Sequence, residues 1–263
     1  MHFRTLAVVA LSTLAGSVAS ATTYSWNFTA GQPGGNYAIN NTGGTFQTVQ
    51  STYNNATQRL TFSVTFTNQI TKGFTLALNN GPNPNGLAGE LALLYFDATN
   101  VASPKITAYG YNGANLQTSW TDGNGGVAGN QTPDRIISTG AAGFTNSASV
   151  VDASGKRTMT FDINVAAINA FSPTYTAGNP WKGIKFDNKV GIWMHPVKSL
   201  ASAYGSSGAT NGFLTNWNIG SGNEGFFDGT NFDTTSSIPL PPAAWAGLIG
   251  LAGAFVVARR RKA

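Results

Sequence analysis

The sequence predicts an all-β fold, an antiparallel β-sandwich or jelly roll, with an N-terminal signal peptide and a C-terminal single transmembrane helix. Three observations predict this arrangement. Segments in the middle of the chain alternate apolar and polar residues, turn-forming residues separate these segments, and uncharged apolar runs stand near both ends. Alternation with a period of two is typical of half-buried strands, and apolar runs beside basic residues are typical of export and membrane segments.

The first 21 residues have the three parts of a secretory signal peptide. His2 and Arg4 form a basic start, an apolar run covers Leu6 to Ala15, and Ala19-Ser20-Ala21 provides the small residues of a cleavage site. The apolar run is too short to cross a bilayer as a helix, although an uncleaved anchor or a buried helix is the alternative. We predict cleavage after Ala21, so that the mature chain begins at Thr22.

The chain between the two end segments carries no net charge. Five of the 15 Lys and Arg residues lie in the end segments, at Arg4 and from Arg259 to Lys262, and all ten Asp and Glu residues lie between them. The ten remaining basic residues match the ten acidic ones, so nucleic acid is not an expected partner. Cysteine is absent, which excludes disulfides, thiolate nucleophiles and cysteine-bound metals.

Residues 22–237 form the predicted extracytoplasmic all-β domain. In the clearest pattern, apolar residues from Leu60 to Phe66 alternate with Thr and Ser, and residues 158–165 repeat this pattern. A short helix is expected around Ala166–Ala170. Because strands do not alternate with helices and no long repeat is visible, the pattern favours a sandwich or jelly roll. Further strands are expected at Thr23–Phe28, Phe46–Ser51, Phe74–Asn79, Glu90–Asp97, Lys105–Tyr111, Lys189–Val197 and Gly212–Ile219.

Residues 238–263 form the predicted membrane-spanning tail. Prolines at positions 239, 241 and 242 precede an uncharged run of sixteen residues, Ala243 to Ala258, and Arg259 to Lys262 follow as a basic stop. As a helix the run is about 24 Å long, enough for a thin membrane, and its basic end is expected to stay in the cytoplasm. A buried helix of the globular domain is the alternative.

This tail resembles the PEP-CTERM sorting signal of bacterial envelope proteins. Pro239-Leu240-Pro241 stands at the position of the proline motif, with Leu240 in place of the usual Glu, and residues 243–258 stand at the position of the helix. Arg259, Arg260 and Arg261 form the terminal cluster. The resemblance covers about the last 26 residues. It implies an exosortase-type sorting enzyme as a partner, passage through the inner membrane, and display at the cell surface or in the extracellular matrix of bacteria that make exopolysaccharide.

The segment from Val190 to Pro196 contains the one histidine of the predicted mature domain. If Ile192 and Met194 point to the core, their neighbours Trp193 and His195 share the opposite strand face. An exposed indole beside an imidazole suits the apolar face of a sugar; the alternative is an ordinary buried tryptophan. The expected carbohydrate-binding residues are Trp193, His195, Trp120 and Trp217. A Ser-His-Asp triad is the catalytic alternative, but no sequence motif marks its serine.

Two glycine-rich segments carry oxygen ligands that suit calcium. Asp122 and Asn124 lie in the first, and Glu224, Asp228 and Asp233 lie in the second. Turn chemistry, in which Asp and Asn cap loops, is the alternative for both segments. No cofactor is required, and calcium is an optional ligand.

The leading functional prediction is an exported cell-surface or matrix protein with a structural or adhesive role, associated with exopolysaccharide. A lectin-like carbohydrate-binding module is the alternative. An extracellular polysaccharide hydrolase is a further alternative, although the sparse carboxylates mark no catalytic residue.

Overall fold

The alternating segments form strands where the sequence pattern is strongest. In β3, Arg59–Phe66, every second side chain from Leu60 to Phe66 is buried, and the Thr and Ser side chains between them are half-buried on the other face. β9, Lys156–Asn164, repeats this pattern and pairs with β3 in antiparallel register, with Leu60 opposite Ile163. Both strands therefore present one apolar face and one polar face.

The computed structural model describes residues 22–29, 41–79, 91–111, 134–172, 181–186, 189–219, 227–233 and 235–237. A short helix, α1 (Ala166–Asn169), and the 3-10 turns η1 (Asn41–Gly43) and η4 (Gly208–Thr210) accompany the strands. The other strands are β1 (Thr23–Thr29), β2 (Phe46–Asn54), β4 (Gly73–Asn79), β5 (Leu91–Asp97), β6 (Lys105–Tyr111), β7 (Asp134–Ser138), β8 (Thr145–Ala153), β10 (Lys189–Val197), β11 (Ala201–Tyr204), β12 (Leu214–Asn218), β13 (Phe227–Asp233) and β14 (Thr235–Ser237).

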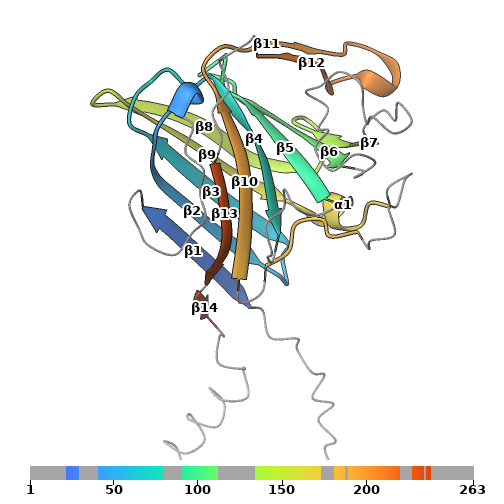
Figure 1. Ribbon diagram of the computed structural model, residues 1–263. Coiled ribbons are helices and arrows are strands. Elements are labelled where there is room, and N and C mark those ends of the chain that lie inside the picture. The colour runs from blue at the N-terminus through green and yellow to red at the C-terminus, as the bar shows by residue number, and fades with distance from the viewer. Residues whose placement is uncertain are drawn as a thin grey trace, which may run out of the picture. The chain divides into compact units, whose positions relative to one another are not determined.

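Within these residues the strands form two six-stranded sheets and one separate hairpin (Figure 1). The first sheet has the order β14-β1-β2-β3-β9-β8, and the second sheet has the order β13-β10-β4-β5-β6-β7. All strand pairs in both sheets are antiparallel. β11 and β12 pair with each other outside both sheets. The predicted antiparallel all-β fold is confirmed.

One apolar core lies between the inner faces of the two sheets. At its centre are four phenylalanines, Phe62 and Phe161 from the first sheet and Phe74 and Phe96 from the second, and none has an exposed side chain. The ring centroids of Phe62 and Phe74 are 6.0 Å apart, and those of Phe96 and Phe161 are also 6.0 Å apart. Rings from different sheets are thus in contact, at the distances that aromatic pairs favour.

The outer face of the first sheet carries rows of hydroxyl and amide side chains. One row crosses β1, β2, β3, β9 and β8 and consists of Asn27, Gln50, Ser63, Thr160 and Ser149. These side chains are exposed or half-buried. The hydroxyls of Ser63 and Thr160 are hydrogen-bonded at 3.1 Å, which is a stabilising cross-strand pair.

The second sheet is covered on its outer face as well as on its inner face. Every residue from Ala92 to Ala98, along β5 and just beyond it, is buried. Leu93 and Tyr95 point away from the shared core and pack against Leu214 and Trp217 of the β11–β12 hairpin. In Figure 1 this hairpin lies beside one end of strands β10, β4 and β5. A sheet with both faces covered needs apolar residues at successive positions.

Some strands were not predicted, because their side chains do not alternate clearly. β8 is an edge strand in which every residue is exposed or half-buried. The expectation of a glycine-rich turn segment around Asp228 and Asp233 is wrong, since β13 pairs with β10 there and places Asp228 opposite Trp193. Backbone pairing with a neighbouring strand outweighs the low strand propensity of its Gly, Asn and Asp residues.

Candidate functional site

The structure confirms the predicted face assignment in β10. Ile192 and Met194 belong to the shared core, and Trp193 belongs to the cluster on the opposite face. The rings of Trp193 and His195 are in contact, with their centroids 4.6 Å apart and their planes at 71°. The two residues predicted to act together therefore lie side by side.

The prediction that Trp193 and Trp217 are exposed for sugar binding is wrong. Only 8% of Trp193 and 3% of Trp217 is accessible to solvent. Trp217 comes from the covering hairpin and packs in the same cluster as Trp193. Because apolar residues continue on the outer face of the second sheet, the hairpin covers that face and leaves no open sugar platform at these two rings.

Polar contacts bind the hairpin to the second sheet. The buried Asp97 accepts hydrogen bonds through Oδ2 from Ser202 Oγ at 2.5 Å and from Tyr204 Oη at 2.9 Å. The Tyr109 hydroxyl donates to the backbone carbonyl of Leu214. Burial raises the pKa of Tyr109 to about 12, although the charge of Arg135 acts in the opposite direction. These contacts favour a hairpin that stays closed.

The predicted calcium ligands fall on different parts of the chain. Asp228 and Asp233 stand five residues apart on β13. At about 3.3 Å per residue their backbones are about 16 Å apart, so one ion is not expected to bind both. Among the described residues, no group of three or more His, Asp or Glu side chains is close enough together to hold a metal. Asp122, Asn124 and Glu224, like the predicted stacking residue Trp120, lie outside the described residues.

The predicted targeting segments also lie outside the described residues. They include Ala19 and Ala21 of the cleavage site, the motif Pro239, Leu240 and Pro241, the helix at 243–258, and the cluster Arg259, Arg260 and Arg261. Within the described ranges, no helix has the length and apolar character that a membrane span requires.

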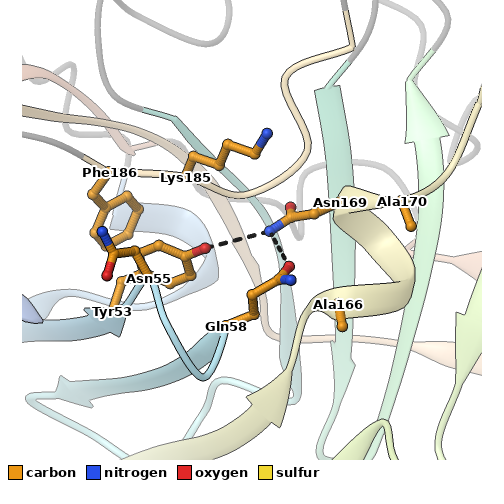
Figure 2. Close-up of a pocket in the computed structure, with 8 residues that line it drawn as sticks. All are labelled: Tyr53, Asn55, Gln58, Ala166, Asn169, Ala170, Lys185 and Phe186. Carbon is orange, nitrogen blue, oxygen red and sulfur yellow. Dashed lines mark hydrogen bonds between the residues drawn. The ribbon is translucent and has the colours of Figure 1, made fainter. Parts of the chain in front are cut away.

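A pocket of about 420 Å³ opens beside α1 and the turn between β2 and β3 (Figure 2). Three of its lining residues carry side-chain amides, one carries a phenol, one an ammonium group and one a phenyl ring. This volume lies in the usual range for small-ligand sites. The lining residues are Tyr53, Asn55, Gln58, Ala166, Asn169, Ala170, Lys185 and Phe186.

The β2–β3 turn brings two of the amides to the pocket. Asn54, at the end of β2, accepts hydrogen bonds through Oδ1 from the backbone N–H groups of Ala56 and Thr57, at 3.0 and 2.9 Å. This is the turn-stabilising contact that asparagine favours. Gln58 completes the turn with a φ of 51°, a left-handed conformation that is uncommon for glutamine. The turn thus places Asn55 and Gln58 at the pocket wall.

Asn169 connects the opposite sides of the pocket (Figure 2). Its Nδ2 donates to Gln58 Oε1 at 3.1 Å and to Tyr53 Oη at 3.4 Å, and its Oδ1 accepts from the backbone N–H of Ile184 at 2.8 Å. Gly183 allows the last contact, because its φ is 56° and a Cβ there would collide with Asn169 Oδ1. Asn169 is therefore a positioning residue that fixes the walls.

Aromatic rings form another part of the wall. Tyr53 and Phe186 are both buried, and their ring centroids are 5.6 Å apart. Burial raises the pKa of Tyr53 above its usual value, the hydrogen bond from Asn169 opposes this shift, and Tyr24 adds to it. The Tyr53 hydroxyl therefore stays protonated at neutral pH and can donate a hydrogen bond. Lys185 is exposed and is the only charged residue among the eight.

The pocket has the groups for binding a polar ligand. Amides, a phenol and an ammonium group can form hydrogen bonds, and the aromatic rings can pack against apolar atoms. General acid–base catalysis uses a positioned titratable group, most often His and otherwise Glu, Asp, Lys, Tyr or Cys. Of the eight described lining residues, Tyr53 and Lys185 are titratable, and none is a His, Asp or Glu.

The sequence pattern did not predict this pocket. It predicted the short helix that carries Asn169, without assigning a ligand to it. The run from Asn54 to Gln58, between two alternating segments, is a signal for a turn. No pattern in the sequence connects that turn with Lys185 and Phe186, which lie more than a hundred residues later.

Comparison of the chain with protein-family models, with curated proteins and with solved structures gave no match.

Proposed function

We propose that this chain is an exported β-sandwich of the bacterial cell surface or extracellular matrix, which binds exopolysaccharide through the pocket without cleaving it. The observation that carries the proposal is the described pocket lining, whose eight residues include three amides, a phenol and an ammonium group and no carboxylate or imidazole. Amides, a phenol and an ammonium group can form hydrogen bonds with sugar hydroxyls. The role is adhesive or structural.

The shared phenylalanine core supports the sandwich part of the proposal. Phe62 contacts Phe74, and Phe96 contacts Phe161, in each case across the two sheets. Two antiparallel sheets whose inner side chains pack together in this way have the arrangement of a β-sandwich. Such a scaffold holds a binding pocket at its end without help from disulfides.

The sorting part of the proposal rests on the two ends of the sequence. The signal peptide ends at Ala21, an exosortase-type enzyme recognises Pro239-Leu240-Pro241, and residues 243–258 hold the chain in the inner membrane during transfer. Mass spectrometry of the surface form tests this. We expect an N-terminus at Thr22 and a C-terminus near Pro242. A surface form that still ends at Ala263 contradicts sorting by cleavage, and a full-length chain found only in the cytosol contradicts export.

Blocking the pocket tests the binding function. Ala170 is exposed at the pocket, so the substitution Ala170→Trp fills space there without disturbing the core. Ala167→Trp is the matched control, because Ala167 is exposed on the same helix but does not line the pocket. In calorimetry against a panel of neutral and acidic oligosaccharides, we expect Ala170→Trp to abolish binding and Ala167→Trp to retain it. The proposal fails if no oligosaccharide binds the unchanged protein, or if both variants bind equally well.

A further inference from the structure

Hydrogen bonds that begin at backbone N–H groups fix the direction in which each pocket amide points, directly for Asn169 and Asn55 and through Asn169 for Gln58. The N–H of Ile184 lies 2.8 Å from one terminal atom of Asn169, and that atom must be the oxygen because an N–H can only donate. The amide nitrogen of Asn169 therefore faces Gln58. Since an amide nitrogen cannot accept a hydrogen bond, the Gln58 atom 3.1 Å away must be its oxygen.

The third amide is fixed in the same way. The backbone N–H of Thr22 donates to Asn55 Oδ1 at 2.9 Å, so the Asn55 oxygen is occupied and its NH2 group is turned away from Thr22. All three amide oxygens of the pocket thus accept hydrogen bonds from within the protein.

The side-chain groups with no partner inside the protein are hydrogen-bond donors, while each amide oxygen has one lone pair occupied and one left. Gln58 and Asn55 offer their NH2 groups, and Lys185 offers an ammonium group. The Tyr53 oxygen already accepts from Asn169, so the proton of this hydroxyl is available to a ligand acceptor. Among the eight lining residues that the structure describes, Lys185 is the one charged residue, and it contributes a positive charge to the pocket.

An acidic sugar matches this set of donors better than a neutral sugar does. A sugar hydroxyl both donates and accepts, and its proton would have to share an amide oxygen that already accepts a hydrogen bond from within the protein. A carboxylate only accepts, through two oxygens, and hydrogen bonds to a charged group are stronger than those between neutral groups. We propose that the pocket binds a uronate, the carboxylate-bearing sugar unit of an acidic polysaccharide. This inference rests on the proposed carbohydrate-binding function and adds the chemical class of the ligand.

Methyl esterification provides a direct test, because it removes the charge of the carboxylate and keeps the sugar. The probes are trimers of galacturonate, mannuronate and guluronate, each compared with its methyl ester by calorimetry at pH 7. We expect at least one free acid to bind about tenfold more tightly than its ester, a difference of about 1.4 kcal/mol. We also expect binding to weaken between low and high salt, because ions screen exposed charges.

The outcomes separate this inference from the proposed function. Equal binding of acid and ester, or binding of neutral oligosaccharides only, overturns the uronate assignment and leaves carbohydrate binding intact. Binding of no oligosaccharide overturns the proposed function as well. If acetate or inorganic phosphate competes as well as the trimers do, the pocket is a simple anion site and the sugar assignment is overturned.

Near-isosteric substitutions test the donors themselves. Gln58→Glu and Asn55→Asp keep the internal acceptor oxygen and replace the outward NH2 group by a negatively charged oxygen. We expect each to weaken binding of the acidic trimer about tenfold or more, and Lys185→Gln to weaken it about threefold to tenfold. The matched controls are Gln50→Glu and Lys156→Gln, at exposed positions of the first sheet that do not line the pocket.

The controls are expected to bind like the unchanged protein, and thermal unfolding verifies that every variant is folded. The inference is wrong if folded Gln58→Glu and Asn55→Asp bind the acid as tightly as the unchanged protein does. It is also wrong if Gln50→Glu loses as much affinity as Gln58→Glu.

Discussion

The outer faces of the two sheets differ in composition and in exposure, although their inner faces share one core. Rows of Thr, Ser, Asn and Gln cover the first sheet, and residues such as Gln50 and Ser149 are in contact with solvent. The second sheet carries Leu93, Tyr95 and Trp193, all buried beneath the β11–β12 hairpin. The comparison shows how side-chain chemistry decides whether a sheet face stays open or needs a cover.

This difference has an energetic consequence. Hydroxyl and amide groups on an open face keep their hydrogen bonds to water, so their substitution changes stability little. Large apolar groups on a covered face are removed from water, and each contributes about 1.5–3 kcal/mol. We therefore expect substitutions in the covered cluster to have large effects and substitutions in the open rows to have small ones.

The largest effect is expected for Trp217→Ala, which removes the main ring of the hairpin from the covered cluster. Truncation of a buried tryptophan costs about 3–5 kcal/mol. The free energy of unfolding, measured with urea, gives this value, and protease cleavage within the 205–213 turn reports whether the hairpin detaches first. A loss below about 1 kcal/mol without faster cleavage would contradict the view that the hairpin is an integral cover.

The next largest effect on the free energy of unfolding is expected for Asp97→Asn at the covered face, which is compared with a matched variant at the open face. It weakens the contacts to Ser202 and Tyr204 of the hairpin, and loss of hydrogen bonds to a buried charge costs about 1.5–3 kcal/mol. Asp162→Asn is the control, because Asp162 binds the exposed Arg59 on the open face and surface ion pairs contribute about 0–1 kcal/mol. Equal losses in the two variants would remove the distinction between the faces.

A pH effect of smaller size is expected at the edge of the first sheet. The hydrogen bond from Arg157 lowers the pKa of Asp152, and partial burial opposes this shift. A lowered folded-state pKa gives stability that is fully present above the unfolded value of about 3.9 and is lost as the pH falls through the folded value. Because Asp152 is partly exposed, we expect a contribution below about 1 kcal/mol.

Comparison of the unchanged protein with Asp152→Asn measures this contribution. The difference in unfolding free energy should be constant from about pH 7 to pH 5 and should disappear towards pH 2. A difference that grows as the pH falls has the opposite sign and would refute the assignment.

The smallest effect is expected for Ser63→Ala on the open face. The substitution removes the hydrogen bond to the Thr160 hydroxyl, but water reaches this half-buried position. We expect the free energy of unfolding to change by no more than about 0.5 kcal/mol. A loss above about 2 kcal/mol would show that the hydroxyl rows stabilise the sheet as strongly as the covered cluster does.

The sequence predicted the inner strands of the open sheet, β1, β2, β3 and β9, but it missed the edge strands β8 and β14. In β3 and β9 the polar residues mark the solvent side, so strand type and face follow from the pattern. β5 contains an uninterrupted run of six apolar residues, Leu91 to Phe96, which indicates burial on both faces and hence a cover. The expectation of an exposed Trp193 failed because it treated β10 as a strand with one open side.

The pocket could not be predicted because its walls come together only in the folded chain. Tyr53, Asn169 and Phe186 belong to three separate segments, and no period in the sequence connects them. The direction of the amides depends on backbone hydrogen bonds such as Ile184 to Asn169, which are set by tertiary structure. Local patterns predicted the short helix but not the turn at Asn54–Gln58, and the binding chemistry arises from how these elements meet.

The contact between Thr22 and Asn55 links the site to maturation of the polypeptide. In the precursor, the Thr22 nitrogen is a neutral peptide N–H. Cleavage after Ala21, as the sequence predicts, turns it into an α-amino group with a pKa of about 7.7–8.0, 2.9 Å from Asn55 Oδ1. If the leader is removed as predicted, a second positive charge lies beside the pocket, and we expect the processed form to hold an anion more tightly than the precursor does.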